Sequence, residues 1–190
     1  MSGRLTPLLV LVPLFLGVLW VFWKSDLRNR FGSTEDAVPI GSSVDLFVST
    51  NGLERQIVHF HQQGCVFAEK NIGHLRILHE KYQSEGWEWC LVVDSNSDRA
   101  QLRETLGFEA KILTESDDIA RLLGVSIAPQ MVIIQEGKIF FRGNYTKNGA
   151  FCGADNILSS DPGIALRAAS KRQELPIYLS RQASFVGCPL

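Results

Sequence analysis

The feature that most constrains this chain is a short apolar segment that delivers a cysteine to the start of a helix. Residues 57–61 (Ile-Val-His-Phe-His) form a β-strand pattern, and Cys65 follows four residues later. An amphipathic helix pattern begins there and closes near Gly86, because its apolar residues recur at steps of three and four. Downstream, Ala128-Pro129 directly precedes a second apolar strand pattern. A thiol at such a junction lies at the positive end of the helix dipole, which stabilises a thiolate.

Strand and helix patterns alternate through the folded part of the chain. The expected strands are 57–61, 89–93, 110–113, 130–135 and 138–142, and the expected helices are 65–86, 97–106, 115–123 and 162–171. Alternation favours parallel pairing, while the turn Glu136-Gly137 predicts a β-hairpin that adds antiparallel strands at one edge. We therefore expect an α/β fold in which a mixed central sheet lies between layers of helices.

The amino-terminal region has a different composition. From Leu5 to Trp23 there is no charged residue, and a helix of that length would be about 28 Å long, close to the hydrocarbon thickness of a bilayer. A cleavable signal peptide is the alternative, but no small-x-small cleavage site follows the run. We therefore expect a transmembrane anchor over residues 1–24, a linker over 25–43, a folded domain over 44–172 and a tail over 173–190.

The orientation of this anchor is indicated differently by two observations. Arg4 precedes the uncharged run, whereas Lys24, Arg28 and Arg30 follow it, so counting basic residues places the folded domain in the cytoplasm. The arrangement of thiols suits an oxidising compartment instead. Our expectation is a single-pass inner-membrane protein whose domain faces the periplasm.

Charge and cysteine content exclude several classes of function. The 190 residues include 19 basic and 20 acidic side chains, giving a net charge of −1, and no basic arm or face indicates nucleic acid as a partner. The cysteines stand at 65, 90, 152 and 188, and no two of them form a CxxC pair. A disulfide framework and a structural zinc site of paired cysteines are therefore not expected.

The segment from Asp118 to Ile134, followed by Gly137-Lys138-Ile139, resembles the second half of a thioredoxin-like domain. In that family a helix ends near a glycine, and a cis-proline, a strand, a tight turn and a return strand follow. Gly64-Cys65 matches the position of the family's first active-site cysteine, and the resemblance covers residues 44–172. With its uncharged amino-terminal run and its Gly149–Gly153 segment, the chain is similar to membrane-anchored thioredoxin-like proteins of Gram-negative bacteria.

This resemblance implies a thioredoxin-like three-layer sandwich preceded by one transmembrane helix. It also implies that Ala128 and Pro129 lie against Cys65 and bind a peptide substrate by strand-like pairing. The chain departs from the family pattern at two positions, because Gly64 replaces a tryptophan and Ala68 replaces the second cysteine. A dithiol mechanism within one motif is therefore excluded.

Three cysteines are candidate catalytic residues. Cys65 is the expected nucleophile, and its resolving thiol is either Cys152 or Cys188. The chain after the hairpin returns to the end of the sheet that carries Cys65, which makes a Cys65–Cys152 bridge plausible; pairing of Cys152 with Cys188 is the alternative. A tail cysteine such as Cys188 is also consistent with a disordered appendage. Cys90 lies within the most apolar strand and is expected to be a buried packing thiol.

Other polar residues carry weaker signals. His59 and His61 share one face of their strand, and with cysteines they could form a soft copper or zinc site, but packing or surface roles are more common for strand histidines. Glu69 and Asp94 show no partner in the sequence and are expected to be solvated. We therefore expect no metal and no cofactor.

Two function hypotheses remain open from the sequence. The first is thiol–disulfide exchange with protein thiols or disulfides, performed by Cys65 with Cys152 or Cys188. The second is a redox-inactive scaffold that keeps the fold and binds a protein partner, and metal handling is a weaker third reading. The membrane is the other expected partner, through the amino-terminal helix.

Overall fold

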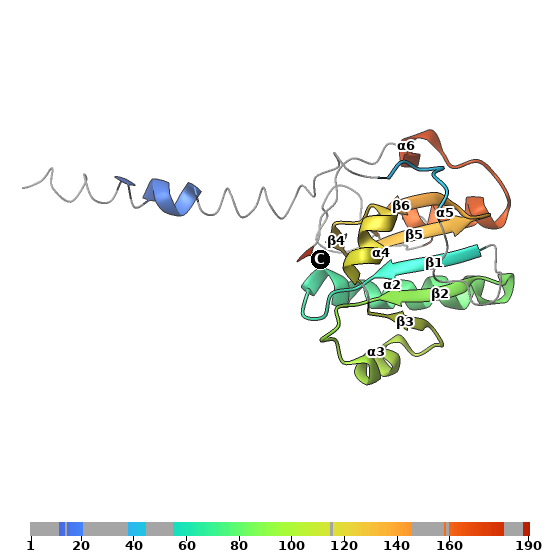
Figure 1. Cartoon of the computed structure of the whole chain (residues 1–190), viewed down its shortest axis with the longest axis horizontal. Coiled ribbons are helices and arrows are strands. Elements are labelled where there is room, and N and C mark those ends of the chain that lie inside the picture. The colour runs from blue at the N-terminus through green and yellow to red at the C-terminus, as the bar shows by residue number, and fades with distance from the viewer. Residues whose placement is uncertain are drawn as a thin grey trace, which may run out of the picture.

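The computed structural model describes residues 12–13, 15–20, 38–44, 55–114, 116–145, 158, 160–180 and 188–190 (Figure 1). The strands are β1 (Arg55–Phe60), β2 (Glu88–Val92), β3 (Lys111–Leu113), β4 (Ile127–Ala128), β5 (Gln130–Gln135), β6 (Lys138–Gly143) and β7 (Cys188–Pro189). The helices are α2 (Val66–Tyr82), α3 (Arg99–Leu106), α4 (Ser116–Leu123), α5 (Asp161–Ser170) and α6 (Ile177–Ser180), with a 3₁₀ turn, η1 (Gln83–Glu85), after α2.

The central sheet has the order β3-β2-β1-β5-β6. β1 pairs in parallel with β2, and β2 with β3, whereas β5 pairs antiparallel with both β1 and β6. The expectation of a parallel core extended by an antiparallel hairpin is confirmed. Since β1 is the middle strand, the residues at its end are enclosed on both sides.

Helices cover both faces of this sheet, as the alternating side chains of β1 require (Figure 1). On one face Ile57 packs in a cluster that includes residues of α2, α3 and α5. On the other face Val58 packs with residues of α4 and with Val44. Each fully buried aliphatic side chain of this kind contributes about 1.5–3 kcal/mol through removal from water. The expected layers of helix, sheet and helix are confirmed.

Local signals set the helix boundaries close to those expected. The side chain of Asp98 accepts hydrogen bonds from the backbone N–H groups of Ala100 and Gln101 at 3.0 and 3.1 Å, so α3 begins after Asp98 rather than at residue 97. The hydroxyl of Ser160 caps α5 by accepting from Gly163 N at 3.3 Å. These caps satisfy N–H groups that the first turn of a helix leaves without partners.

Residues at both ends of the expected domain contact the sheet or its core. Gly41 N donates to Ile139 O at 2.8 Å, and Val44 N donates to Gly137 O at 2.9 Å, so residues 38–44 run beside the outer strand β6. At the other end, the side chain of Leu179 in α6 is fully buried in the cluster beneath α5. The folded unit therefore includes residues that we assigned to the linker and to the tail.

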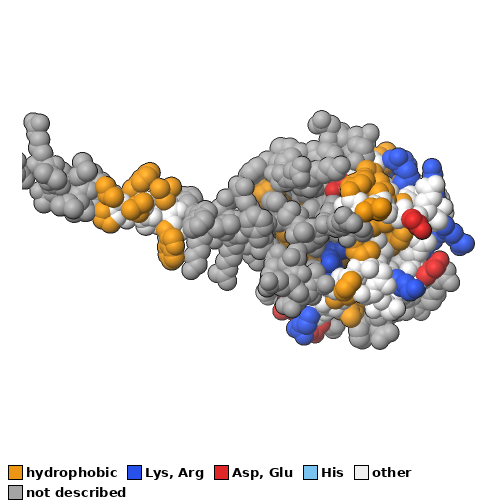
Figure 2. Space-filling view, turned by 90° about the horizontal axis from the view of Figure 1, so that it is seen from above, with side chains coloured by type: hydrophobic (Ala, Val, Ile, Leu, Met, Phe, Trp, Pro, Cys, Tyr) orange, Lys and Arg blue, Asp and Glu red, His pale blue; other side chains and the backbone are white. Residues whose placement is uncertain are grey.

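Helical backbone is described at residues 12–13 and 15–20 within the uncharged amino-terminal run. The large apolar side chains in this part are exposed, and Figure 2 shows them as a hydrophobic stretch. Within the described residues, no helix has the length and apolar character needed to cross a membrane. Residues 1–11, 14 and 21–24 of the expected anchor lie outside the described part of the chain.

Candidate functional site

Cys65 lies where the chain leaves the central strand and enters α2. It is the N-cap residue of this helix, with extended backbone angles, and its carbonyl accepts the first helical hydrogen bond from Glu69 N at 3.0 Å. The turn before it depends on Gly64, whose φ of +80° favours glycine. A sulfur on the N-cap residue lies at the positive end of the helix dipole, which favours the charged thiolate over the thiol.

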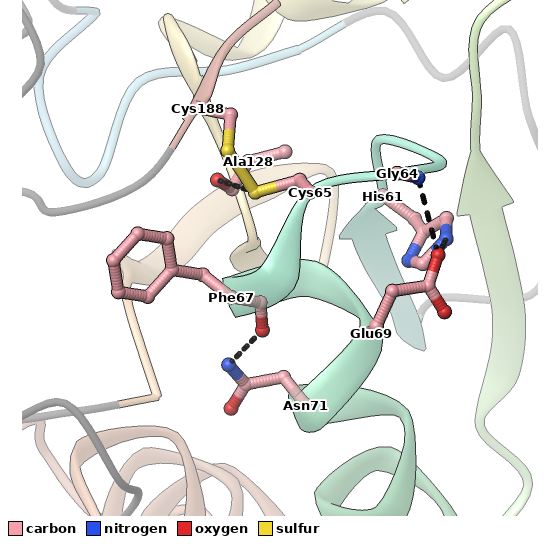
Figure 3. Close-up of a disulfide and its surroundings, with 8 residues drawn as sticks. All are labelled: His61, Gly64, Cys65, Phe67, Glu69, Asn71, Ala128 and Cys188. Atoms are coloured by element: carbon pink, nitrogen blue, oxygen red, sulfur yellow. Dashed lines mark hydrogen bonds and ion pairs between the residues drawn. A yellow bond between two sulfur atoms is a disulfide. The ribbon is translucent and has the colours of Figure 1, made fainter.

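The sulfur of Cys65 is bonded to that of Cys188 (Figure 3). The Cα atoms of the two residues are 6.2 Å apart, within the usual span of a disulfide. Of the pairings left open by the sequence, the structure therefore contains Cys65–Cys188, and neither Cys65–Cys152 nor Cys152–Cys188 can exist beside it. Cys188 is a bridged residue rather than part of a disordered appendage. Cys152 itself lies outside the described residues.

The Ala128–Pro129 peptide bond is cis, as the resemblance implied, and it lies beside the disulfide. The carbonyl oxygen of Ala128 is 3.9 Å from Sγ of Cys65, and the reduced thiol could donate to it (Figure 3). Ala128 also belongs to strand β4, which pairs antiparallel with β7 in a separate two-stranded sheet. Of the two residues predicted to bind a peptide, Ala128 therefore contacts both the nucleophile and an extended segment of this same chain.

His61 and Glu69 form a polar contact on the other side of the Cys65 turn. His61 Nε2 is 3.7 Å from Glu69 Oε1, and the same carboxylate oxygen accepts a hydrogen bond from Gly64 N at 3.3 Å (Figure 3). Burial lowers the pKa of His61, against the opposing effect of Glu69, so the imidazole is neutral near pH 7. Glu69 is exposed, as expected for a solvated carboxylate, but it also has partners that the sequence did not indicate, because one turn of α2 brings it back to the turn that precedes Cys65.

A second buried pair lies deeper under the same end of the sheet. The hydroxyl of Tyr145 is hydrogen-bonded to Nδ1 of His59 at 2.7 Å, and both side chains are almost fully buried. Burial lowers the pKa of His59 well below its usual value, with a smaller contribution from His61, and raises the pKa of Tyr145 well above its own. Both side chains are therefore neutral near pH 7.

Tyr145 was not among the residues predicted for the site. The topology contains the relevant signal, because the hairpin returns the chain to the Cys65 end of the sheet. His59 stands opposite Met131, and Met131 stands opposite Gly143, so the residues after Gly143 emerge on that side. The prediction that the chain returns there is confirmed by Tyr145, whereas residues 146–152 lie outside the described part.

Two of the weaker expectations can be placed as well. Cys90 is a free, buried thiol, and burial, reinforced by nearby Glu88, raises its pKa to about 12, so the prediction of a packing thiol is confirmed. Among the described residues there is no group of three or more histidine, cysteine, aspartate or glutamate side chains arranged to hold a metal ion. His59 and His61 are instead engaged with Tyr145 and Glu69.

The geometry permits one kind of reaction at Cys65. A thiolate that attacks the disulfide at Cys188 would release Cys65, whose negative charge the start of α2 stabilises. Cys65 is 4% exposed in the bridged state, whereas Cys188 is half-buried, so the outer sulfur belongs to the more accessible residue. The site can therefore open and close a disulfide.

No protein-family model matches the chain, and no curated protein sequence matches it significantly. Solved structures do match its fold. A hypothetical protein from Sinorhizobium meliloti is similar with a TM-score of 0.64 at 16% identity, over 85% of this chain and 96% of its own. An uncharacterized conserved protein from Geobacillus kaustophilus has a TM-score of 0.62 at 16% identity, over 80% and 90%.

A third similar structure has a described activity. It is a putative thiol:disulfide interchange protein DsbE from Chlorobium tepidum, with a TM-score of 0.54 at 15% identity, over 70% of this chain and 99% of its own. At such low identity the likeness shows the fold alone. Together with the cis-proline beside Cys65, it establishes that this chain has a thioredoxin-like fold.

Proposed function

We propose that this protein catalyses thiol–disulfide exchange through Cys65, with Cys188 as the second thiol. The observation that carries the proposal is the Cys65–Cys188 disulfide at the start of α2, with the carbonyl of Ala128 3.9 Å from the Cys65 sulfur. The missing CxxC partner at position 68 is replaced by a cysteine that is distant in sequence. The substrates are protein thiols or disulfides, in keeping with the similarity to the thiol:disulfide interchange protein of Chlorobium tepidum.

The exchange has two steps, each of which conserves electrons. In the reduced protein the Cys65 thiolate attacks a substrate disulfide, forming a mixed disulfide and releasing one substrate thiolate. The Cys188 thiolate then attacks the Cys65 sulfur, releasing the second substrate thiolate and forming Cys65–Cys188. The substrate gains two electrons and the protein loses two, and the reverse sequence oxidises a substrate dithiol.

The proposal is tested by stopped-flow reaction of the fully reduced protein with a small aromatic disulfide near pH 7. We expect a fast phase that is lost in Cys65→Ser and retained in Cys90→Ala. In Cys188→Ser the first step persists, but the mixed disulfide accumulates instead of resolving. Cys152→Ser tests the remaining prediction for Cys152, since a resolving role would make this variant behave like Cys188→Ser.

An unreactive Cys65 would contradict the proposal. If the Cys65→Ser chain reacted at the same rate as the parent, and partner binding were unchanged, the redox-inactive scaffold would be the better description. The same variants distinguish the two functions because only the exchange reaction needs the Cys65 sulfur.

We also propose that residues 1–24 anchor the domain in the inner membrane and that the domain faces the periplasm. The uncharged run supports the anchor, and the presence of a Cys65–Cys188 disulfide suits an oxidising compartment. Membrane fractionation followed by extraction at high pH tests anchoring. Labelling of intact cells with a membrane-impermeant maleimide after mild reduction tests the orientation, since cytoplasmic cysteines would remain unlabelled.

A further inference from the structure

The segment Cys188–Leu190 lies on the cis-proline loop as an added strand. Ala128 stands opposite Cys188, and Ile127 stands opposite Pro189, in antiparallel register. The N–H of Leu190 donates to the carbonyl of Ser126 at 3.2 Å, so the contact continues beyond the disulfide. The segment is therefore held by both a covalent bond and strand pairing.

The register explains how a proline fits into this strand. Antiparallel strands alternate between pairs that exchange hydrogen bonds and pairs that do not. The bond from Leu190 to Ser126 flanks the Ile127–Pro189 pair, which makes this pair a non-hydrogen-bonded one. Pro189 thus occupies a position where no backbone N–H is needed, and the segment pairs with β4 without losing a hydrogen bond.

We propose that residues 188–190 occupy, within the same chain, the edge where an extended segment of a partner protein binds, and that reduction of the disulfide opens this edge. This proposal deepens the proposed function and rests on it. A partner segment that fits this edge places a cysteine opposite Ala128. The residue after that cysteine can be a proline, and the second residue after it donates its backbone N–H to the carbonyl of Ser126. Strand addition of this kind takes its affinity from main-chain hydrogen bonds and its specificity from the side chains at alternate positions.

Opening requires an external dithiol as the reductant. Its thiolate attacks the Cys188 sulfur, forming a mixed disulfide with Cys188 and releasing the Cys65 thiolate. The second thiol of the reductant then attacks that mixed disulfide and releases Cys188 as a thiolate. The reductant loses two electrons in becoming a disulfide, the two cysteines of this chain gain them, and the Ser126–Ala128 edge becomes free.

The first test measures which thiol forms the most favourable mixed disulfide with Cys65 when the edge is free. The full-length Cys188→Ser chain is equilibrated with a redox buffer of either glutathione or a synthetic peptide. The peptide has the sequence of residues 184–190 and blocked ends. The mixed disulfides formed on Cys65 are quantified by mass spectrometry. Two further peptides carry Leu190→Pro, which removes the N–H that pairs with Ser126, or Leu190→Ala, which keeps it. We expect the parent and Leu190→Ala peptides to form the mixed disulfide at least tenfold more favourably than glutathione, and Leu190→Pro to lose roughly two- to tenfold, as for one hydrogen bond.

The alternative results are distinguishable. Equal equilibrium constants for glutathione and the three peptides would overturn the proposal that this edge binds a partner segment, while leaving the proposed exchange at Cys65 intact. Absence of any mixed disulfide would overturn both the inference and the proposed function.

The second test measures whether the edge opens. Amide hydrogen exchange of segments 126–128 and 188–190 is compared in the oxidised and the reduced parent protein. Exchange in β1 serves as the control for global unfolding. We expect faster exchange in both segments on reduction, with β1 unchanged. Equal protection of both segments in the two states would show that the tail stays in place and would overturn the redox gate.

Discussion

Replacing Cys188 with serine removes the disulfide to Cys65, and we expect this to lower the free energy of unfolding by several kcal/mol. The bridge joins residues separated by 123 positions, so it closes nearly the whole folded domain into a loop. The chain-entropy relation for a loop of this length gives about 5 kcal/mol at 25 °C, while measured disulfides commonly contribute about 2–4 kcal/mol. Against a total stability of about 5–15 kcal/mol for a domain, this is a large share.

Urea unfolding followed by circular dichroism measures the effect. The oxidised parent and Cys188→Ser are compared, each with and without dithiothreitol. Free energies extrapolated to water are compared rather than midpoints, because a cross-linked unfolded chain is more compact and has a smaller m-value. We expect dithiothreitol to lower the free energy of unfolding of the parent to that of Cys188→Ser, and to leave the free energy of unfolding of that variant unchanged. An equal free energy for the oxidised parent and the variant would refute the argument, as would an equal effect of dithiothreitol on both.

Four other predictions follow from single contacts. Gly64→Ala should cost about 1–2 kcal/mol, because its φ of +80° is unfavourable for a residue with a Cβ, and urea unfolding measures the loss. Tyr145→Phe should cost about 1–3 kcal/mol by leaving buried Nδ1 of His59 without its partner at 2.7 Å; a variant as stable as the parent would contradict this. The pKa of His61 is lowered in the folded state, so its contribution to stability is complete above pH 6.5 and is lost as the pH falls through the lowered value; the loss between pH 7.5 and 5.0 should be smaller in His61→Gln. Cys90, whose pKa is raised to about 12, should react with maleimide only after unfolding, and rapid labelling of the native protein would contradict its burial.

Most of the fold could be predicted from local sequence patterns. The apolar run before Cys65, the turn at Glu136-Gly137 and the glycines at 86, 107 and 124 act over short distances, and each predicted an element or a boundary that the structure contains. The order of parallel strands and a terminal hairpin follows from connection lengths. Boundaries were less accurate, because the hydrogen bonds that join residues 38–44 to β6 and the burial of Leu179 depend on tertiary contacts.

The candidate site was predictable only in part. The place of Cys65 beside a cis-proline follows from the strand–helix junction and the resemblance. The bridge from Cys65 to Cys188 does not follow from the sequence. It depends on where a distant segment pairs with β4, and the periodicity of apolar residues carries no information about that pairing. The partners of Glu69 and Tyr145 were also missed, because a turn of α2 brings Glu69 to His61 and the chain after β6 brings Tyr145 to His59.

The most direct test of the central claim is mass-spectrometric mapping of Cys65 after acid quenching during reaction with a substrate peptide disulfide. In the parent protein the account predicts a transient Cys65–peptide disulfide that is converted to Cys65–Cys188. In Cys188→Ser the same mixed disulfide should persist, with Cys90 free in both. A free Cys65 throughout the reaction, or conversion to Cys65–Cys152 in place of Cys65–Cys188, would contradict the account.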